Sequence, residues 1–152
     1  MSYEIKQEEK FKFIEEGEGD VLMLLHGLFG ALSNFKDLIE HFRKNYKVVV
    51  PILPLMEMDL LNTTVGGLQK FVNRFIEHRN YTDINLLGNS LGGHIALVHI
   101  LRNPEKIKSL ILTGSSGLFE SAMGDTYPKR GDREYIRNKT CLLYTSPSPR
   151  DS

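Results

Sequence analysis

The chain has 152 residues, of which 41% are apolar and 25% are charged, so it can bury one hydrophobic core and no more. Basic and acidic residues are equal in number, 19 of each, and they do not cluster, so nothing favours nucleic acid or an anionic membrane as a partner. The N-terminal segment has no apolar core of the kind that a secretory signal needs, and no run approaches the ~18 apolar residues of a membrane span. These observations predict a cytoplasmic protein.

Short apolar runs along the chain predict the strands of a sheet. Residues 3–6 and 11–14 are expected to form edge strands ahead of a polar turn at 17–20. Four later runs are wholly or almost wholly apolar, a pattern typical of strands buried on both faces of a parallel sheet. These runs cover residues 21–25, 46–53, 84–87 and 109–113.

Helical patterns separate these runs. The first predicted helix covers about residues 33–44, with Ser33 or Asn34 as its N-cap, and the second covers about residues 64–78 behind a threonine cap. The third follows Ser90 and is apolar nearly all round, so we expect it to be the most buried helix. Strands that alternate with helix-length crossovers predict a parallel α/β sheet with helices on both faces.

A G-x-S-x-G motif lies between the third apolar run and the third helix, as Gly88-Asn89-Ser90-Leu91-Gly92. In a nucleophile elbow, a serine in this motif sits on a sharp strand-to-helix turn with its hydroxyl exposed, and the glycines avoid collisions with the neighbouring strand and helix. The context therefore favours Ser90 as a catalytic nucleophile. The alternative is that Ser90 merely caps a helix after a glycine turn.

A second motif, His26-Gly27-Leu28-Phe29-Gly30, follows the first of the buried runs. With the motif around Ser90, it makes the chain resemble the α/β-hydrolase superfamily. Within that family it is most similar to the C–C bond hydrolases of ring-cleavage products and to related carboxylesterases. The finer resemblance depends on the asparagine before Ser90, the double glycine after it, and the sequence Ser-Asn-Phe at 33–35.

The resemblance implies a domain organisation. The full family fold has eight strands, with the nucleophile after the fifth and a lid inserted after the sixth, so this chain is expected to be truncated after the sixth strand. Residues 1–116 are then the N-terminal part of the α/β-hydrolase core, and residues 117–140 begin the lid.

Residues 141–152 resemble a translated sequencing adapter, because they back-translate to the sequence that transposase-based libraries attach to fragments. The alternative is a natural, disordered terminus rich in serine and proline. Under the adapter interpretation the single cysteine, Cys141, is not native, and no thiol remains for a disulfide, a metal or a nucleophile.

Hydrolysis through an oxyanion needs two fixed hydrogen-bond donors. The elbow motif predicts the backbone N–H of Leu91 as one donor. The resemblance implies the N–H of Leu28 as the other, with Phe29 as the less favoured choice, and it implies substrate contacts from Phe29, Asn34 and Asn89. The alternative for Asn34 is that it serves as a helix N-cap. The alternative for Asn89 is that it forms a hydrogen bond within the turn.

None of the five histidines is assigned as the general base. His94 and His99 lie five positions apart on one predicted helix and so on different faces, which argues against a shared metal site, and we expect no metal and no cofactor. The resemblance places the triad aspartate and histidine after the seventh and eighth strands. A minority of the family takes its acid from the region of Glu120, Asp125 and Asp132.

The expected function is that of an N-terminal fragment of a serine hydrolase, inactive by itself, whose parent cleaves an ester or C–C bond of a small organic acid. Two alternatives stay open on the same fold. One is a ligand-binding member that has lost the triad, and the other is an acyltransferase. The expected partner is a small-molecule substrate, and the oligomeric state stays open.

Overall fold

The computed structural model describes residues 3–27, 32–55, 57 and 64–116. The strands in this part of the chain are β1 (Lys6–Glu8), β2 (Phe11–Glu16), β3 (Asp20–Leu25), β4 (Tyr46–Pro51), β5 (Ile84–Asn89) and β6 (Ile107–Thr113). The helices are α1 (Lys36–Phe42), α2 (Val65–His78) and α3 (Leu91–Arg102), with short 3-10 turns η1 (Leu32–Phe35) and η2 (Pro104–Lys106). The predicted lid region 117–140 and the tail 141–152 lie outside the described residues.

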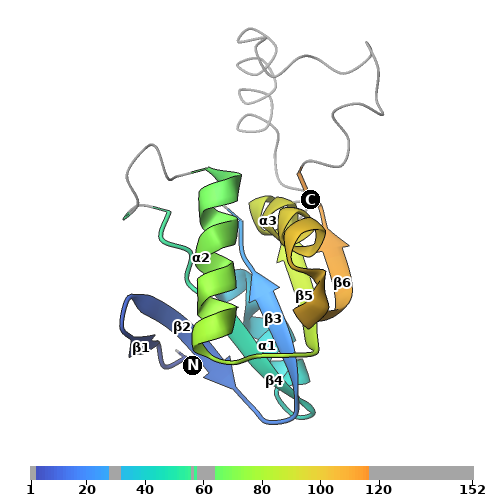
Figure 1. The fold of residues 1–152 in the computed structure, drawn as a ribbon. Coiled ribbons are helices and arrows are strands. Elements are labelled where there is room, and N and C mark those ends of the chain that lie inside the picture. The colour runs from blue at the N-terminus through green and yellow to red at the C-terminus, as the bar shows by residue number, and fades with distance from the viewer. Residues whose placement is uncertain (1–2, 28–31, 56, 58–63, 117–152) are drawn as a thin grey trace, which may run out of the picture. The chain divides into compact units, whose positions relative to one another are not determined.

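The strands form one mixed sheet in the order β1-β2-β4-β3-β5-β6 (Figure 1). β4, β3, β5 and β6 are parallel, whereas β1 and β2 add to one side of the sheet in antiparallel fashion. β3 lies at the centre, with Leu22 paired to Val48 of β4 and to Asn85 of β5. The predicted α/β class and the mostly parallel sheet are confirmed.

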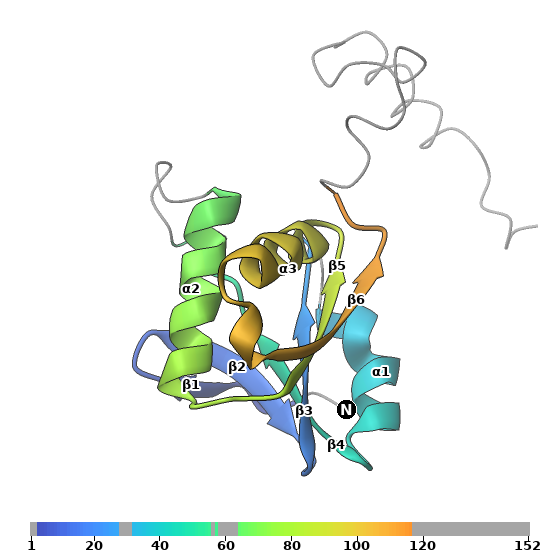
Figure 2. The same ribbon diagram turned by 45° about the vertical axis from the view of Figure 1, so that its right-hand side comes forward.

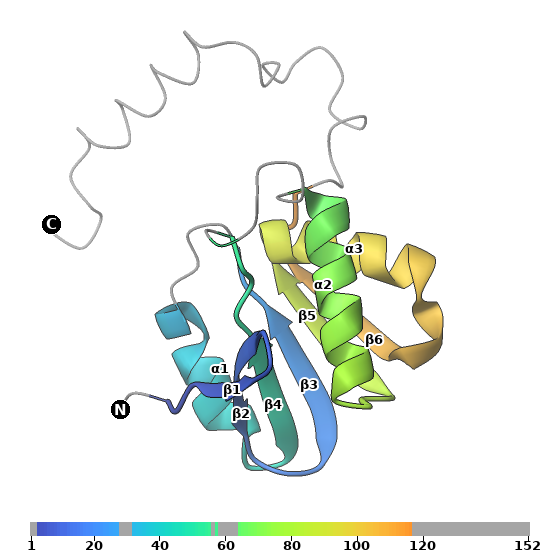
Figure 3. The same ribbon diagram turned by 60° about the vertical axis from the view of Figure 1, so that its left-hand side comes forward.

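Helices cover both faces of the sheet, as predicted. Figures 2 and 3 show α2 and α3 together on one side and α1 on the opposite side. Because successive residues of a strand point to opposite faces, Met23 and Leu25 pack beneath α2 and α3, while Leu22 and Leu24 pack against α1. This double burial explains why the parallel strands appear in the sequence as apolar runs without alternation.

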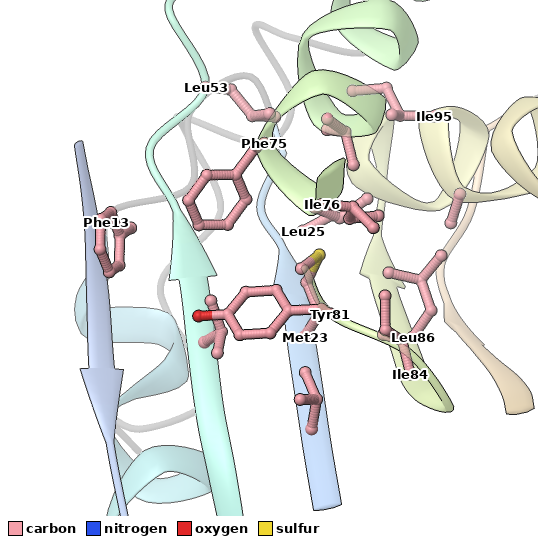
Figure 4. Packing of buried hydrophobic residues seen from close by; sticks show 14 of the residues in the cluster. Phe13, Met23, Leu25, Leu53, Phe75, Ile76, Tyr81, Ile84, Leu86 and Ile95 are labelled. Carbon is pink, nitrogen blue, oxygen red and sulfur yellow. The ribbon is translucent and has the colours of Figure 1, made fainter. Parts of the chain in front are cut away.

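The larger core lies between the sheet and α2. Figure 4 shows Phe13, Met23, Phe75, Tyr81 and Leu86 in this layer. The rings of Phe13 and Phe75 have centroids 5.2 Å apart at a tilted angle, a geometry that aromatic pairs prefer over a face-to-face sandwich. Packing of this kind fixes α2 against the sheet.

Two details of the predicted elements are wrong. β1 covers Lys6–Glu8 rather than residues 3–6. The first helix has neither Ser33 nor Asn34 as its N-cap, because η1 precedes α1 directly and Phe35 stands at the cap without a side-chain bond. The prediction for α2 is confirmed, since Thr64 Oγ1 accepts the Gly67 N–H at 3.1 Å.

The expectation that α3 is the most buried helix is confirmed among the described residues, since five of its 12 residues are buried, against five of 14 in α2 and one of seven in α1. Its buried residues form one stripe with the spacing i, i+3, i+4 and i+7, together with Gly93. The other apolar positions of α3 are half-buried, except for Leu101, which is 81% exposed. Apolar composition all round a helix therefore did not indicate burial all round.

A charged cluster fixes the end of α2 to the N-terminal hairpin. Arg79, the C-cap of α2, forms ion pairs with Glu8 and, at 2.9 Å, with Glu15, and the Tyr81 hydroxyl donates to Glu15. Burial by itself would raise the pKa of Glu15, but the Tyr81 hydrogen bond and the charge of Arg79 outweigh it and hold that pKa below its usual value. Lys6 adds a further bond to the same carboxylate.

Candidate active site

Ser90 lies between the last residue of β5 and the first residue of α3, in the predicted strand–turn–helix arrangement. Its backbone has φ 53° and ψ −117°, a conformation that costs a non-glycine residue roughly 1–3 kcal/mol and persists only where its surroundings impose it. Its side chain makes no capping hydrogen bond. The alternative that Ser90 merely caps α3 is therefore wrong.

Backbone hydrogen bonds hold Ser90 in this conformation. Its N–H donates to the carbonyl oxygen of Thr113, at the end of β6, at 3.1 Å. Its own carbonyl oxygen accepts the N–H groups of Gly93 at 3.0 Å, His94 at 3.3 Å and Ser116 at 3.2 Å. The first turn of α3 and the segment after β6 thus both bind the Ser90 backbone.

The two motif glycines allow the close contacts that the sharp turn requires. A Cβ on Gly88 would lie 2.6 Å from the carbonyl oxygen of Gly92, and a Cβ on Gly92 would lie 2.0 Å from the carbonyl oxygen of Leu25 in β3. Both obstacles are backbone atoms, which cannot move aside as a flexible side chain can. The predicted steric reason for these glycines is confirmed.

The first amide of α3 is the one that the sequence predicts as an oxyanion donor. Among the described residues, the N–H of Leu91 has no hydrogen-bond acceptor. It is the first N–H of the helix, where the unpaired amides and the helix dipole favour a negative charge. Its position immediately after Ser90 is the one that the elbow motif predicts for an oxyanion donor.

The segment after β3 lies directly against Ser90. A Cβ on Gly27 would be 3.1 Å from Ser90 Cβ and 3.5 Å from Ser90 Oγ. This contact follows from the sheet, because β3 and β5 are parallel neighbours with Leu25 paired to Gly88, and their carboxyl ends meet at one edge. Leu28 and Phe29, predicted as oxyanion donor and substrate contact, follow Gly27 and lie outside the described residues.

His26 shapes the start of this loop. Its buried ring accepts the N–H of Leu53 on Nε2 at 3.0 Å, and its Nδ1 lies 2.9 Å from the Gly27 carbonyl oxygen. A backbone N–H only donates, so Nε2 carries no proton here and Nδ1–H is the donor to Gly27. His26 thereby connects the exit of β3 to the segment after β4.

Two of the predicted substrate contacts lie among the described residues. Asn34 is exposed within η1 and does not cap α1. Asn89 donates from Nδ2 to the carbonyl oxygen and to Oγ1 of Thr113, each at 3.0 Å. Its side chain thus bonds the end of β6 rather than the turn itself, which is the alternative considered for it, while Asn89 Oδ1 has no hydrogen-bond donor among the described residues.

Among the described residues, no side chain forms a hydrogen bond with Ser90 Oγ, and none is found for the rings of His41 and His94. The hydrogen bonds of the other histidines go elsewhere: those of His26 to Gly27 and Leu53, that of His78 to Glu8, and that of His99 to Gln69. Glu120, Asp125 and Asp132 lie outside the described residues. In the same part of the chain, no three histidine, cysteine or acidic side chains gather as a metal site, and each helix is too short or too polar to cross a membrane.

Thr113 and Ser116 are contacts of Ser90 that sequence reasoning missed. Both lie at or just beyond the end of β6, and neither belongs to a recognised motif. The register of the sheet identifies Thr113, because it lies opposite Asn89 in the β5–β6 pair. Knowing that β5 and β6 are adjacent would therefore have been sufficient to find it.

The sheet order and the serine on a sharp turn after a central parallel strand define the class of protein. The sequence matches the model of the alpha/beta hydrolase fold over residues 20–140. The chain belongs to this family.

Among solved structures, the chain is similar to MGS-MChE2, an alpha/beta hydrolase enzyme from the metagenome of sediments from the lagoon of Mar Chica, Morocco. The TM-score is 0.73 at 49% identity, over 77% of this chain and 54% of that one. Two curated relatives carry more specific names. The 2-hydroxymuconate semialdehyde hydrolase of Pseudomonas sp. (strain CF600) is 27% identical over 118 residues, and the match covers 68% of this chain and 39% of that protein.

The 1-acylglycerol-3-phosphate O-acyltransferase of Arabidopsis thaliana is 40% identical over 118 residues, covering 66% of this chain and 26% of that protein. The chain thus spans less than half the length of both curated relatives and about half that of the solved enzyme.

Proposed function

We propose that the complete protein is a serine hydrolase that cleaves an ester or a C–C bond of a small organic substrate, with Ser90 as the nucleophile. The observation that carries this proposal is the strained Ser90 backbone, at φ 53°, directly before the acceptor-free N–H of Leu91. Strain of this kind is concentrated at functional sites. Here it places a hydroxyl beside a helix N-terminus at the carboxyl edge of a parallel sheet.

In the proposed reaction, Ser90 Oγ attacks the substrate carbonyl carbon while its proton passes to a general base. The carbonyl oxygen becomes an oxyanion, which the amides of Leu91 and Leu28 would bind. Collapse of the oxyanion expels the leaving group, which takes up the proton, and water then releases the acyl group from Ser90. Losing one such donor costs about 2.7–4 kcal/mol in a serine hydrolase.

The base and its carboxylate partner are proposed to lie outside the described residues. The chain spans 39% of the curated hydrolase relative and 54% of the solved enzyme. Each of these two proteins is therefore long enough to carry a base and a carboxylate beyond the part that this chain matches. A serine without a base is a weak nucleophile. We therefore expect the 152-residue chain to be inactive and the complete protein to be active.

The substrate class is proposed from the motifs and the relatives together. The asparagine before Ser90 and the double glycine after it resemble those of the C–C hydrolases, and one relative is named a 2-hydroxymuconate semialdehyde hydrolase. Phe29 and Asn34 are proposed as substrate contacts. Asn89 is proposed as a third contact through Oδ1, since its Nδ2 bonds Thr113. We propose a cytoplasmic location and no cofactor.

A fluorophosphonate probe tests the role of Ser90. In the complete protein we expect one labelled residue, Ser90, and loss of labelling in Ser90→Ala. Aryl-ester turnover of Ser90→Ala should fall by about 10⁶, which is the loss for a serine hydrolase without its nucleophile. Turnover that survives in Ser90→Ala would disprove this role.

Under the adapter interpretation of residues 141–152, replacing them with the continuation of the gene tests the location of the base. We expect aryl-ester activity to rise by several orders of magnitude, because about 10³–10⁴ over water is all that an oxyanion hole and binding supply without the triad. Equal, Ser90-dependent rates for the two proteins would mean that the base lies within the 152 residues.

Acyl transfer is the second candidate function, because one relative at 40% identity is named an O-acyltransferase. Transfer uses the same acyl-Ser90 intermediate and differs only in the group that attacks it. Adding a small alcohol to an ester assay separates the two functions. A hydrolase should yield mainly free acid, whereas a transferase should yield mainly the new ester at low alcohol concentration.

A further inference from the structure

Two similar side-chain pairs join β5 and β6. In the strand register, Asn85 lies opposite Ser109, and Asn89 lies opposite Thr113. At the first pair, Ser109 Oγ donates to Asn85 Oδ1 at 2.7 Å. At the second, Asn89 Nδ2 lies 3.0 Å from both the carbonyl oxygen and Oγ1 of Thr113. The second pair adjoins Ser90, and the first lies at the opposite end of β5.

The Thr113 carbonyl oxygen connects the second pair to Ser90. It accepts the Ser90 N–H at 3.1 Å in addition to the amide of Asn89. A carbonyl oxygen has two lone pairs, so residues 89 and 90 use both of them. The contact to Thr113 Oγ1 holds the Asn89 amide in a second direction, so the amide cannot turn away without losing a hydrogen bond.

The turn after β6 also binds the other side of Ser90. Ser116 donates its N–H to the Ser90 carbonyl oxygen at 3.2 Å. Between these contacts, Gly114 has φ +53°, which glycine adopts without steric cost. Both polar backbone groups of Ser90, the residue with the strained conformation, are therefore bound by residues 113–116.

We propose that Asn89 and Thr113 are positioning residues for the reaction at Ser90. Their side-chain pair fixes the end of β6, and the Thr113 carbonyl oxygen transmits this to the Ser90 backbone, so that Ser90 Oγ keeps its orientation. This inference rests on the proposed function of Ser90. It assigns a role to Thr113, and it gives the amide nitrogen of Asn89 a role separate from any contact with the substrate.

Replacing Thr113 in the complete protein tests this role. Thr113→Val keeps the shape and the carbonyl group but removes the acceptor Oγ1. We expect kcat for an aryl ester to fall about tenfold, the equivalent of one hydrogen bond, with KM changed by less than about twofold, because Thr113 acts through Ser90 rather than on the substrate. Thr113→Ser restores the hydroxyl, and kcat should return to within about threefold of the starting value.

A double-mutant cycle tests whether the two residues act through one contact. If they do, Asn89→Ala combined with Thr113→Val should lower kcat no further than Asn89→Ala alone. Losses that multiply would overturn the inference. A rise in KM in Thr113→Val equal to that in Asn89→Ala would also overturn it, because Thr113 would then act on the substrate rather than on Ser90.

Ser109→Ala is the matched control, since it removes a hydroxyl from the equivalent pair at the far end of the same strands. It should leave kcat unchanged even where it lowers the melting temperature. If Ser109→Ala lowered kcat as much as Thr113→Val does, the loss would be due to the general stability of the sheet, and the inference would be overturned.

Hydrogen exchange of the Ser90 amide gives a readout that needs no catalysis. Exchange should be faster in Thr113→Val and unchanged in Ser109→Ala. The reason is that the carbonyl oxygen of Thr113, and not that of Ser109, accepts the Ser90 N–H. Unchanged exchange in both variants overturns the positioning role. Full activity in Ser90→Ala would instead overturn the proposed function, and the exchange result would still decide whether Thr113 fixes the Ser90 backbone.

Discussion

Gly92 of α3 and Leu25 of β3 are in backbone contact: a Cβ on Gly92 would lie 2.0 Å from the Leu25 carbonyl oxygen. Gly92→Ala should therefore separate α3 from the sheet and destabilise the fold by several kcal/mol, of the order of other strongly disruptive core changes, about 4–5 kcal/mol. Urea unfolding followed by circular dichroism would measure this loss.

Gly66→Ala is the control for that substitution. Gly66 lies in the first turn of α2, and the nearest atom that its Cβ would meet is 3.8 Å away. Alanine at this helical position should stabilise the protein by about 0.4–1 kcal/mol, because it restricts the unfolded chain. Equal effects of the two substitutions would mean that contact with Leu25 does not matter.

Glu15→Gln should make the stability less dependent on pH in the acid range. Hydrogen bonding to Tyr81 and the charge of Arg79 lower the folded-state pKa of Glu15 against its burial. A lowered carboxyl pKa contributes stability that is present above the unfolded value of 4.5 and is lost as pH falls through the folded value. The variant should be less stable by roughly 1–3 kcal/mol at pH 7, and the difference should shrink by pH 3.

Urea midpoints at the two pH values test this expectation. A difference that stays constant between pH 7 and pH 3 would show that the charge of Glu15 is not what stabilises the cluster.

His99→Leu should remove a separate pH dependence, between about pH 5.5 and 7.5. His99 is fully buried, its Nδ1 lies 3.2 Å from Gln69 Nε2, and its Nε2 has no hydrogen-bond partner within the part of the chain that the structure describes. Burial lowers its pKa, so below the ordinary value of 6.5 the unfolded chain binds a proton that the folded chain refuses. Stability then falls with falling pH, by at most about 1.4 kcal/mol per pH unit.

Stability curves at pH 5.5 and 7.5 measure this effect. The leucine variant should show a smaller difference between the two curves, and it also removes the unpaired Nε2–H. His41→Gln, which changes an exposed side chain on α1, should leave the difference as it is. If His99→Leu left the difference in stability between pH 5.5 and pH 7.5 unaltered, His99 would not be the source of this pH dependence.

Ile111→Lys should reduce self-association of the chain. β6 ends the strand order, and Ile111 on it is 44% exposed, so within the described residues an apolar strand has an unpaired edge. Such edges pair with other chains, and lysine on them prevents it. Light scattering over a range of concentrations should show association of the unmodified chain and less of it in the variant.

Leu101→Lys provides the comparison. Leu101 is 81% exposed but lies on α3, where the helix already satisfies the backbone groups. It should reduce association less than Ile111→Lys. A monodisperse unmodified chain that unfolds cooperatively would refute the expectation for both.

The apolar runs of the sequence predicted the sheet well, because β3, β4 and β5 are buried on both faces and so carry their pattern locally. Element ends depended on contacts that the local sequence does not contain. η1 displaces the start of α1 past Asn34, and Leu101 is exposed although it lies on the apolar helix α3.

The candidate site was predictable to the extent that its chemistry lies in contiguous motifs. The sharp turn at Ser90 was predictable because it demands glycines on both sides of it, and the roles of Ser90 and Leu91 stay predictions. The contact of Thr113 with Ser90 was not predicted, since it arises from the β5–β6 register rather than from the neighbours of Thr113 in sequence. Leu28 and Phe29 remain predictions.

The order of the strands also has a consequence for how the protein folds. β3 and β5 are neighbours although a helix, a strand and a second helix separate them in the chain, and the Asn85 side chain reaches a carbonyl oxygen 64 positions earlier. Non-local pairings of this kind slow folding, because loop-closure entropy is lost before contacts compensate for it. We therefore expect Gly27 and Ser90 to meet only after β3 and β5 have paired, and in the complete protein the proposed reactivity of Ser90 would report a late step of refolding.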